Sequence, residues 1–116
     1  MTDVPFVIIN KVKCNETTDG AGADDLQIKI DGVLVFGGPR GTAIDSGQEK
    51  IVNQSRAFDT IAKVSLWEWD SGSGDDHIGS FFVSASQVDD GERAFNLIGD
   101  GSDYDVFYQV EEAFNP

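Results

Sequence analysis

The sequence has few of the residues from which zinc, disulfide and nucleic-acid sites are built. One cysteine and one histidine among 116 residues allow no internal disulfide and no zinc centre of nitrogen and sulfur ligands. Eight basic residues stand against 21 acidic ones, and a net charge of −13 argues against binding to nucleic acid. No apolar run approaches the roughly 20 residues of a membrane-spanning helix. Residues 1–5 lack the features of a signal peptide, so we expect a cytoplasmic location, with secretion as the alternative.

What the chain does contain is enough apolar material for one folded domain over residues 1–116. Hydrophobic residues make up 40% of the sequence, with eight Phe, two Trp and two Tyr, which excludes wholesale disorder. Thirteen Gly against three Pro indicate many tight turns. No composition shift or linker divides the sequence.

Helical periodicity is almost absent, and short β-branched and aromatic runs alternate with Gly/Asp/Ser clusters. This pattern predicts an all-β fold, an antiparallel eight-stranded β-sandwich. Within residues 60–69, side chains of alternating polarity predict one buried and one outward face. Asp31-Gly32 is the composition of a two-residue hairpin turn. The expected strands cover residues 6–13, 26–31, 33–36, 49–53, 60–69, 78–85, 93–98 and 104–112.

One phrase occurs twice: Asp, four small residues, then Asp-Asp, at residues 19–25 and 70–76. Small residues let the backbone turn back, so that carboxylates six positions apart can converge. Several converging anions repel one another unless a cation lies among them. Because the strands are expected to be antiparallel, every second connection lies at the same end of the sandwich. That end collects eleven of the 21 acidic residues, with Arg40 as its one base: Glu16, Asp19, Asp24, Asp25, Asp45, Glu68, Asp70, Asp75, Asp76, Asp100 and Asp103.

Calcium is the ion that suits these loops, because it takes six to eight oxygen ligands in a tolerant geometry. Magnesium keeps its waters and fits a dense carboxylate cage less well. The phrase is not an EF-hand, which needs acids at alternate positions and flanking helices. The alternative is that Asp and Gly serve as turn formers only; this alternative applies most to Asp100 and Asp103, for which turn and ligand roles are equally open.

Residues 68–79, Glu-Trp-Asp-Ser-Gly-Ser-Gly-Asp-Asp-His-Ile-Gly, resemble the third calcium loop of C2 domains. In that family an acid-aromatic-acid triplet precedes a short loop with a Ser, followed by Asp, any residue, Ile and Gly. Ser73 matches the Ser position, and Ile78-Gly79 matches the exit into the next strand. The resemblance implies three calcium ligands, the first a Glu where the family usually has Asp: Glu68, Asp70 and Asp76.

The first C2 loop is similar to residues 19–25, where it implies Asp19 and Asp25 as ligands ahead of an alternating strand. Asp24 would take the place of Asp25 if the register shifts by one. The long final strand at 104–112 fits the circularly permuted, type II-like C2 topology. Membrane-docking C2 domains carry large apolar or basic residues at their loop tips, and those tips are small here.

We therefore expect a non-catalytic module that binds one to three calcium ions, which order the acidic loops for a sensor, adhesion or targeting role. A protein partner would meet the ordered loops. Calcium-dependent phospholipid binding is the less favoured alternative, since three calcium ions would leave the net charge of −13 at −7. Paired carboxylates can also hydrolyse glycosides, but 116 residues leave little room for a deep cleft. A structural domain whose acids bind nothing is the remaining alternative.

Overall fold

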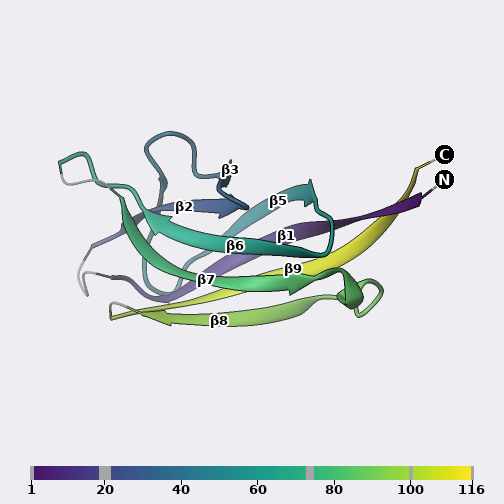
Figure 1. The fold of residues 1–116 in the computed structure, drawn as a ribbon. Helices are drawn as coiled ribbons and strands as arrows, with labels where there is room; N and C mark the ends of the chain where they lie inside the picture. The colour runs from purple at the N-terminus through teal and green to yellow at the C-terminus, as the bar shows by residue number, and fades with distance from the viewer. Residues whose placement is uncertain (1, 19–21, 73–74, 100, 116) are drawn as a thin grey trace.

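Two antiparallel β-sheets face each other in the computed structural model, which describes residues 2–18, 22–72, 75–99 and 101–115 (Figure 1). The four-stranded sheet has the order β5-β1-β9-β8, and the five-stranded sheet has the order β3-β2-β6-β7 with β4 paired to β2. The described part of the chain has no helix long and apolar enough to cross a membrane. The elements are β1 (Thr2–Glu16), β2 (Asp24–Ile30), β3 (Val33–Phe36), β4 (Thr42–Ile44), β5 (Glu49–Ala57), β6 (Ile61–Glu68), β7 (Asp76–Ser84), the 3₁₀ turn η1 (Ala85–Gln87), β8 (Arg93–Gly99) and β9 (Ser102–Asn115).

The expected all-β antiparallel sandwich is confirmed, but the described residues form nine strands and not eight. The additional strand, β4, pairs with the start of β2, from Asp24 opposite Ile44 to Leu26 opposite Thr42. Its three residues are too few to show a pattern in the sequence, and the pairing with β2 holds them extended. The first and last strands are also longer than expected, because β1 and β9 pair along almost their whole length.

Local sequence accounts for the β2–β3 hairpin and for the two faces of β6. Asp31 and Gly32 both have positive φ, 51° and 80°, as the twist of a two-residue hairpin requires. In β6, Ala62, Val64 and Leu66 are fully buried, while the residues between Ala62 and Val64 and before Ala62 face outward. The expected alternation therefore places one face of β6 against the opposite sheet.

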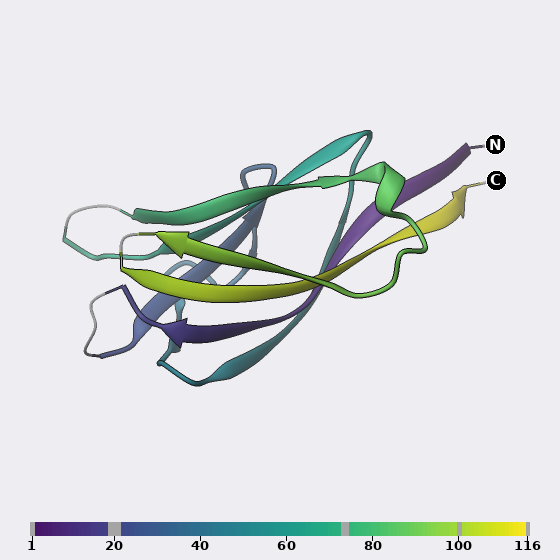
Figure 2. The same ribbon diagram turned by 90° about the horizontal axis from the view of Figure 1, so that it is seen from below.

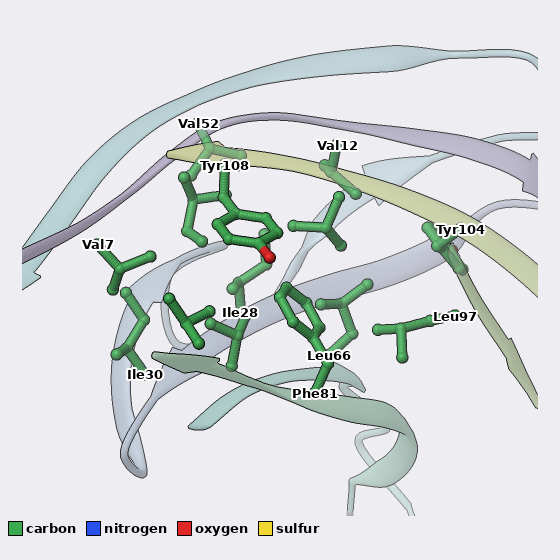
Figure 3. Packing of buried hydrophobic residues seen from close by; sticks show 14 of the residues in the cluster. Val7, Val12, Ile28, Ile30, Val52, Leu66, Phe81, Leu97, Tyr104 and Tyr108 are labelled. Carbon is green, nitrogen blue, oxygen red and sulfur yellow. The ribbon is translucent and has the colours of Figure 1, made fainter. Parts of the chain in front are cut away.

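The core lies between the two sheets and is made mainly of aliphatic side chains (Figure 3). Phe81 from β7 stacks on Phe95 from β8, with ring centroids 4.5 Å apart, and closes the side where these two edge strands meet. Two tyrosines from β9, Tyr104 and Tyr108, are buried among the aliphatic residues. Burial of these side chains supplies the main favourable free energy of folding.

The acidic loops and the chain termini occupy opposite ends of the sandwich (Figures 1 and 2). Strands β1, β6 and β8 end, and strands β2, β7 and β9 begin, at the same end. Residues 45–48 also pack there, since the Gly47 backbone N–H donates to the Cys14 carbonyl at 2.7 Å. The expectation that both copies of the acidic phrase belong to one end of the molecule is therefore met by the strands that flank them.

Gly37 is a position where the loop after β3 tolerates no side chain. Its φ is +104°, and a Cβ there would lie 2.1 Å from the Leu26 carbonyl oxygen. We expect Gly37→Ala to lower the free energy of unfolding by about 3 kcal/mol, because strain at positive φ and a backbone clash add. Gly38→Ala is the matched control, with positive φ but nothing within 4 Å of its Cβ. Urea unfolding should show a clearly smaller loss for Gly38→Ala; equal losses would contradict the clash.

Candidate metal centre

Two of the predicted ligands face each other at the mouth of the loop between β6 and β7. Glu68 is the last residue of β6, Asp76 is the first residue of β7, and the two are paired across the strands. Side chains of directly paired residues lie on the same face of a sheet, so these two carboxylates are neighbours. Asp70 follows Glu68 by two residues and accepts a hydrogen bond from the Gly72 backbone N–H at 2.9 Å.

The loop between β1 and β2 is brought beside the β6–β7 loop by the pairing of β2 with β6. Leu26 lies opposite Glu68, and the Trp69 backbone N–H donates to the Asp25 carbonyl at 2.8 Å. Asp25 is half-buried and precedes Leu26 directly, so its carboxylate belongs to the same end as Glu68 and Asp76. Asp19, the other ligand predicted in this loop, and Asp100 lie outside the described residues.

Asp24 differs from its neighbour Asp25 because its side chain points into the protein. It is 0% exposed, on the same side of β2 as Leu26 and Ile28. Its carboxylate accepts hydrogen bonds from the Thr18 backbone N–H at 3.1 Å, from the Thr18 hydroxyl at 2.7 Å and from the Tyr104 hydroxyl. The Thr18 hydroxyl also lies 3.2 Å from Oε2 of Glu68. A buried carboxylate is stable only with such partners.

These contacts change the pKa values of both Asp24 and Tyr104. Burial alone would raise the pKa of Asp24, but hydrogen bonding with Glu68, Thr18 and Tyr104 outweighs burial and holds it below its ordinary value. Burial, together with the ionised Asp24 beside it, raises the pKa of the Tyr104 hydroxyl. At neutral pH the arrangement is therefore an ionised carboxylate and a neutral phenol that donates to it.

The lowered pKa of Asp24 predicts an acid-sensitive contribution to stability. An aspartate with a lowered pKa in the folded state stabilises the protein above its unfolded pKa of about 3.9, and loses that contribution as the pH falls further. We expect the free energy of unfolding, measured with urea between about pH 7 and pH 3, to fall more steeply in the wild type than in Asp24→Asn. An equal fall in the free energy of unfolding of the two proteins over this pH range would contradict the lowered pKa of Asp24.

The candidate ligands within the described part of the chain do not surround a common point. Among residues 2–18, 22–72, 75–99 and 101–115, no three His, Cys, Asp or Glu side chains form a group that could hold an ion. Asp103, a weaker candidate, is bound elsewhere, since its Oδ1 accepts from the side-chain amides of Asn96 at 2.6 Å and Asn15 at 3.1 Å. His77 pairs with the Ser80 hydroxyl at 2.7 Å and packs against Trp67.

Thr18 and Tyr104 are residues of this end that the sequence pattern did not predict. Part of this could be read from the sequence. Because side chains alternate along a strand, an acid at position 24 lies on the same face as Leu26 and Ile28 and is predicted to be buried. A buried acid requires a donor, but the sequence does not indicate that the donor is a tyrosine 80 residues away.

Compared by sequence, the chain matches no family model and no curated protein. Solved structures do match. The human GIVD cytosolic phospholipase A2 is 15% identical with a TM-score of 0.60; the match covers 97% of this chain but 17% of the phospholipase. A C2 domain of plant extended synaptotagmin 1 is 12% identical with a TM-score of 0.52, covering 97% of this chain and 96% of that domain. A third structure, described as a C2 domain, is 14% identical with a TM-score of 0.57, covering 93% and 98%.

These similarities define the fold as C2-like. The expected resemblance to C2 domains is confirmed at the level of architecture. The first strand, β1, lies between β5 and the final strand, β9, in one sheet, and the type II-like permutation stays a prediction. Since the identities lie between 12% and 15%, these similarities show the fold and nothing further about function. The activity of the full phospholipase does not transfer to a chain that spans 17% of its length.

Proposed function

We propose that this chain is a non-catalytic calcium-binding module, in which the ion orders the acidic loops at one end of the sandwich. The observation that carries the proposal is the pairing of Glu68 with Asp76, beside a strand that brings Asp25 to the same end. The proposed ligands from the described residues are Asp25, Glu68, Asp70 and Asp76. Asp19 joins them through its sequence spacing.

The chemistry of this donor set fits calcium. Every proposed donor is a carboxylate, a hard oxygen ligand of the kind that calcium prefers. The softer donors are engaged elsewhere, since Cys14 is buried in the core and the single His pairs with Ser80. The chain would supply negative charge and carbonyl groups, and the ion would supply the positive charge that lets the carboxylates approach one another.

The energetic cycle follows from the repulsion between these acids. Without calcium, the like charges of Glu68 and Asp76, which are paired across the two strands, repel one another. With calcium, the loops would close around the ion and the surface at this end would change. A sensor, adhesion or targeting role would use that changed surface to meet a protein partner. We propose a cytoplasmic location for this module.

One of the matched structures suggests a probe for the experiment. A structure of the human GIVD phospholipase, 16% identical over 97% of this chain with a TM-score of 0.56, was determined in complex with terbium chloride. Terbium is a hard cation whose emission is excited through a nearby tryptophan. Trp69, between the proposed ligands Glu68 and Asp70, places such a tryptophan beside the proposed site.

The experiment that tests the proposal is a titration of chelator-treated protein with calcium, followed by calorimetry. We expect saturable binding of one to three ions, and terbium emission excited through tryptophan that calcium competes away. Magnesium should compete poorly, because it keeps its own waters. Absence of both calorimetric heat at millimolar calcium and calcium-sensitive terbium emission would overturn the proposal.

A second candidate function is calcium-dependent docking on phospholipid, and one side chain favours it. Ile98, paired with Asp103 near the end of β8, is 74% exposed at the acidic end. An exposed isoleucine there could enter the lipid interface after calcium neutralises the carboxylates. Co-sedimentation with phosphatidylserine vesicles tests this function: binding should need calcium and be weakened by Ile98→Ser. Equal sedimentation with calcium and with chelator would exclude it.

A further inference from the structure

The carboxylate of Asp24 is buried and hydrogen-bonded within the protein, although Asp24 belongs to the repeated acidic segment at residues 19–25. Its Oδ1 accepts from the Thr18 hydroxyl at 2.7 Å, and its Oδ2 accepts from the Thr18 backbone N–H at 3.1 Å and from the Tyr104 hydroxyl. With an exposed fraction of 0%, neither oxygen faces solvent. A calcium ion would have to displace these donors before it could bind Asp24.

The partners of Asp24 come from the loop after β1 and from a strand of the opposite sheet. Thr18 lies two residues after the end of β1, while Tyr104 belongs to β9, in the sheet opposite that of Asp24 (Figure 1). The Thr18 hydroxyl also lies 3.2 Å from Glu68 Oε2, at the start of the β6–β7 loop. Asp24 therefore connects the β1–β2 loop, through Thr18, with Tyr104 of the opposite sheet, and Thr18 in turn contacts Glu68 before the β6–β7 loop.

We propose that Asp24 is a positioning residue and not a calcium ligand: together with Tyr104 it fixes Thr18 and, through Thr18, Glu68. This inference rests on the proposed calcium function and assigns the adjacent residue, Asp25, as the ligand of that loop. It separates two neighbouring aspartates into different roles by their burial, because Asp24 is 0% exposed and Asp25 is half-buried.

The physical effect of this arrangement is preorganisation. The free energy of ordering Thr18 and Glu68 is spent when the chain folds, so less of it opposes calcium binding later. Groups that orient metal ligands through hydrogen bonds commonly change metal affinity by about 10–100-fold when they are removed. Loss of the Tyr104 hydroxyl should therefore weaken calcium binding, although Tyr104 is buried in the core and on the opposite sheet.

The test compares calcium affinity and stoichiometry by calorimetry, at a temperature where every variant is folded. We expect Tyr104→Phe to weaken calcium binding by about tenfold, and Asp24→Asn by about tenfold or more, with the number of ions unchanged in both. The double variant should bind no more weakly than Asp24→Asn alone, because both changes remove the same interaction. Tyr108→Phe is the matched control, a buried tyrosine of the same strand whose hydroxyl meets Gln87 instead; it should keep the wild-type affinity.

Each contrary outcome has its own meaning. If Asp24→Asn loses one ion while Tyr104→Phe binds calcium as the wild type does, Asp24 is a ligand and the inference is overturned. If both variants lose thermal stability but keep wild-type affinity, their role is structural and the inference is likewise overturned. If the wild type binds no calcium, the proposed function itself fails, and the positioning role fails with it.

Discussion

Saturating calcium is expected to raise the melting temperature of this protein by about 10 °C. A ligand that binds only the folded state stabilises it by about 2.7 kcal/mol when its concentration is 100 times its dissociation constant. For a domain of this size, each kcal/mol corresponds to about 4 °C. The effect should be large here because the ion also removes repulsion between acids that the fold holds at one end, such as Glu68 and Asp76.

The measurement is thermal unfolding by circular dichroism in chelator, in calcium and in magnesium. The metal-free protein should still unfold cooperatively, because the core between the sheets contains none of the proposed calcium ligands. Magnesium should give a smaller shift than calcium at the same concentration. Superimposed melting curves in chelator and in millimolar calcium would contradict the proposed function.

Much of the fold could be predicted because local chemistry determines it. The two residues of the Asp31-Gly32 turn both adopt positive φ, as their composition predicts, and the buried face of β6 follows from alternation. Strand β4 could not be predicted, since its three residues are extended only through pairing with the start of β2. The additional length of β1 comes from β9, a partner about 100 residues away in the sequence.

In the candidate metal centre, too, part of the arrangement could be predicted from the sequence and part depends on tertiary contacts. The resemblance to the third C2 loop predicts Glu68, Asp70 and Asp76 as a set, and antiparallel pairing brings the first and last of them together. Alternation along β2 predicts that Asp24 is buried, but no sequence feature predicts the donors that its carboxylate meets. The difference between Asp24 and Asp25 arises from the register of β2 and from Tyr104, which lies in the other sheet.

Neutralising one proposed ligand should change stability and calcium affinity in opposite directions. In the absence of calcium, Asp76→Asn is expected to raise the free energy of unfolding by a few tenths of a kcal/mol, because it removes a like charge directly opposite Glu68. In the presence of calcium, the same variant should bind the ion about 100-fold more weakly. Loss of one charged partner from a desolvated contact costs about 2–5 kcal/mol, and each 1.4 kcal/mol is a factor of ten.

The control for total charge is Asp59→Asn, an exposed aspartate in the β5–β6 connection at the end away from the acidic loops. It changes the net charge by the same amount as Asp76→Asn and should leave calcium affinity unchanged. Asp70→Asn should behave as Asp76→Asn does in calcium, since both belong to the same proposed ligand set. Calorimetry and melting curves on the three variants separate the alternatives. An equal loss of affinity in Asp59→Asn would mean that calcium responds to the overall charge of −13 and not to a built site, because only a specific site depends on which carboxylate is removed.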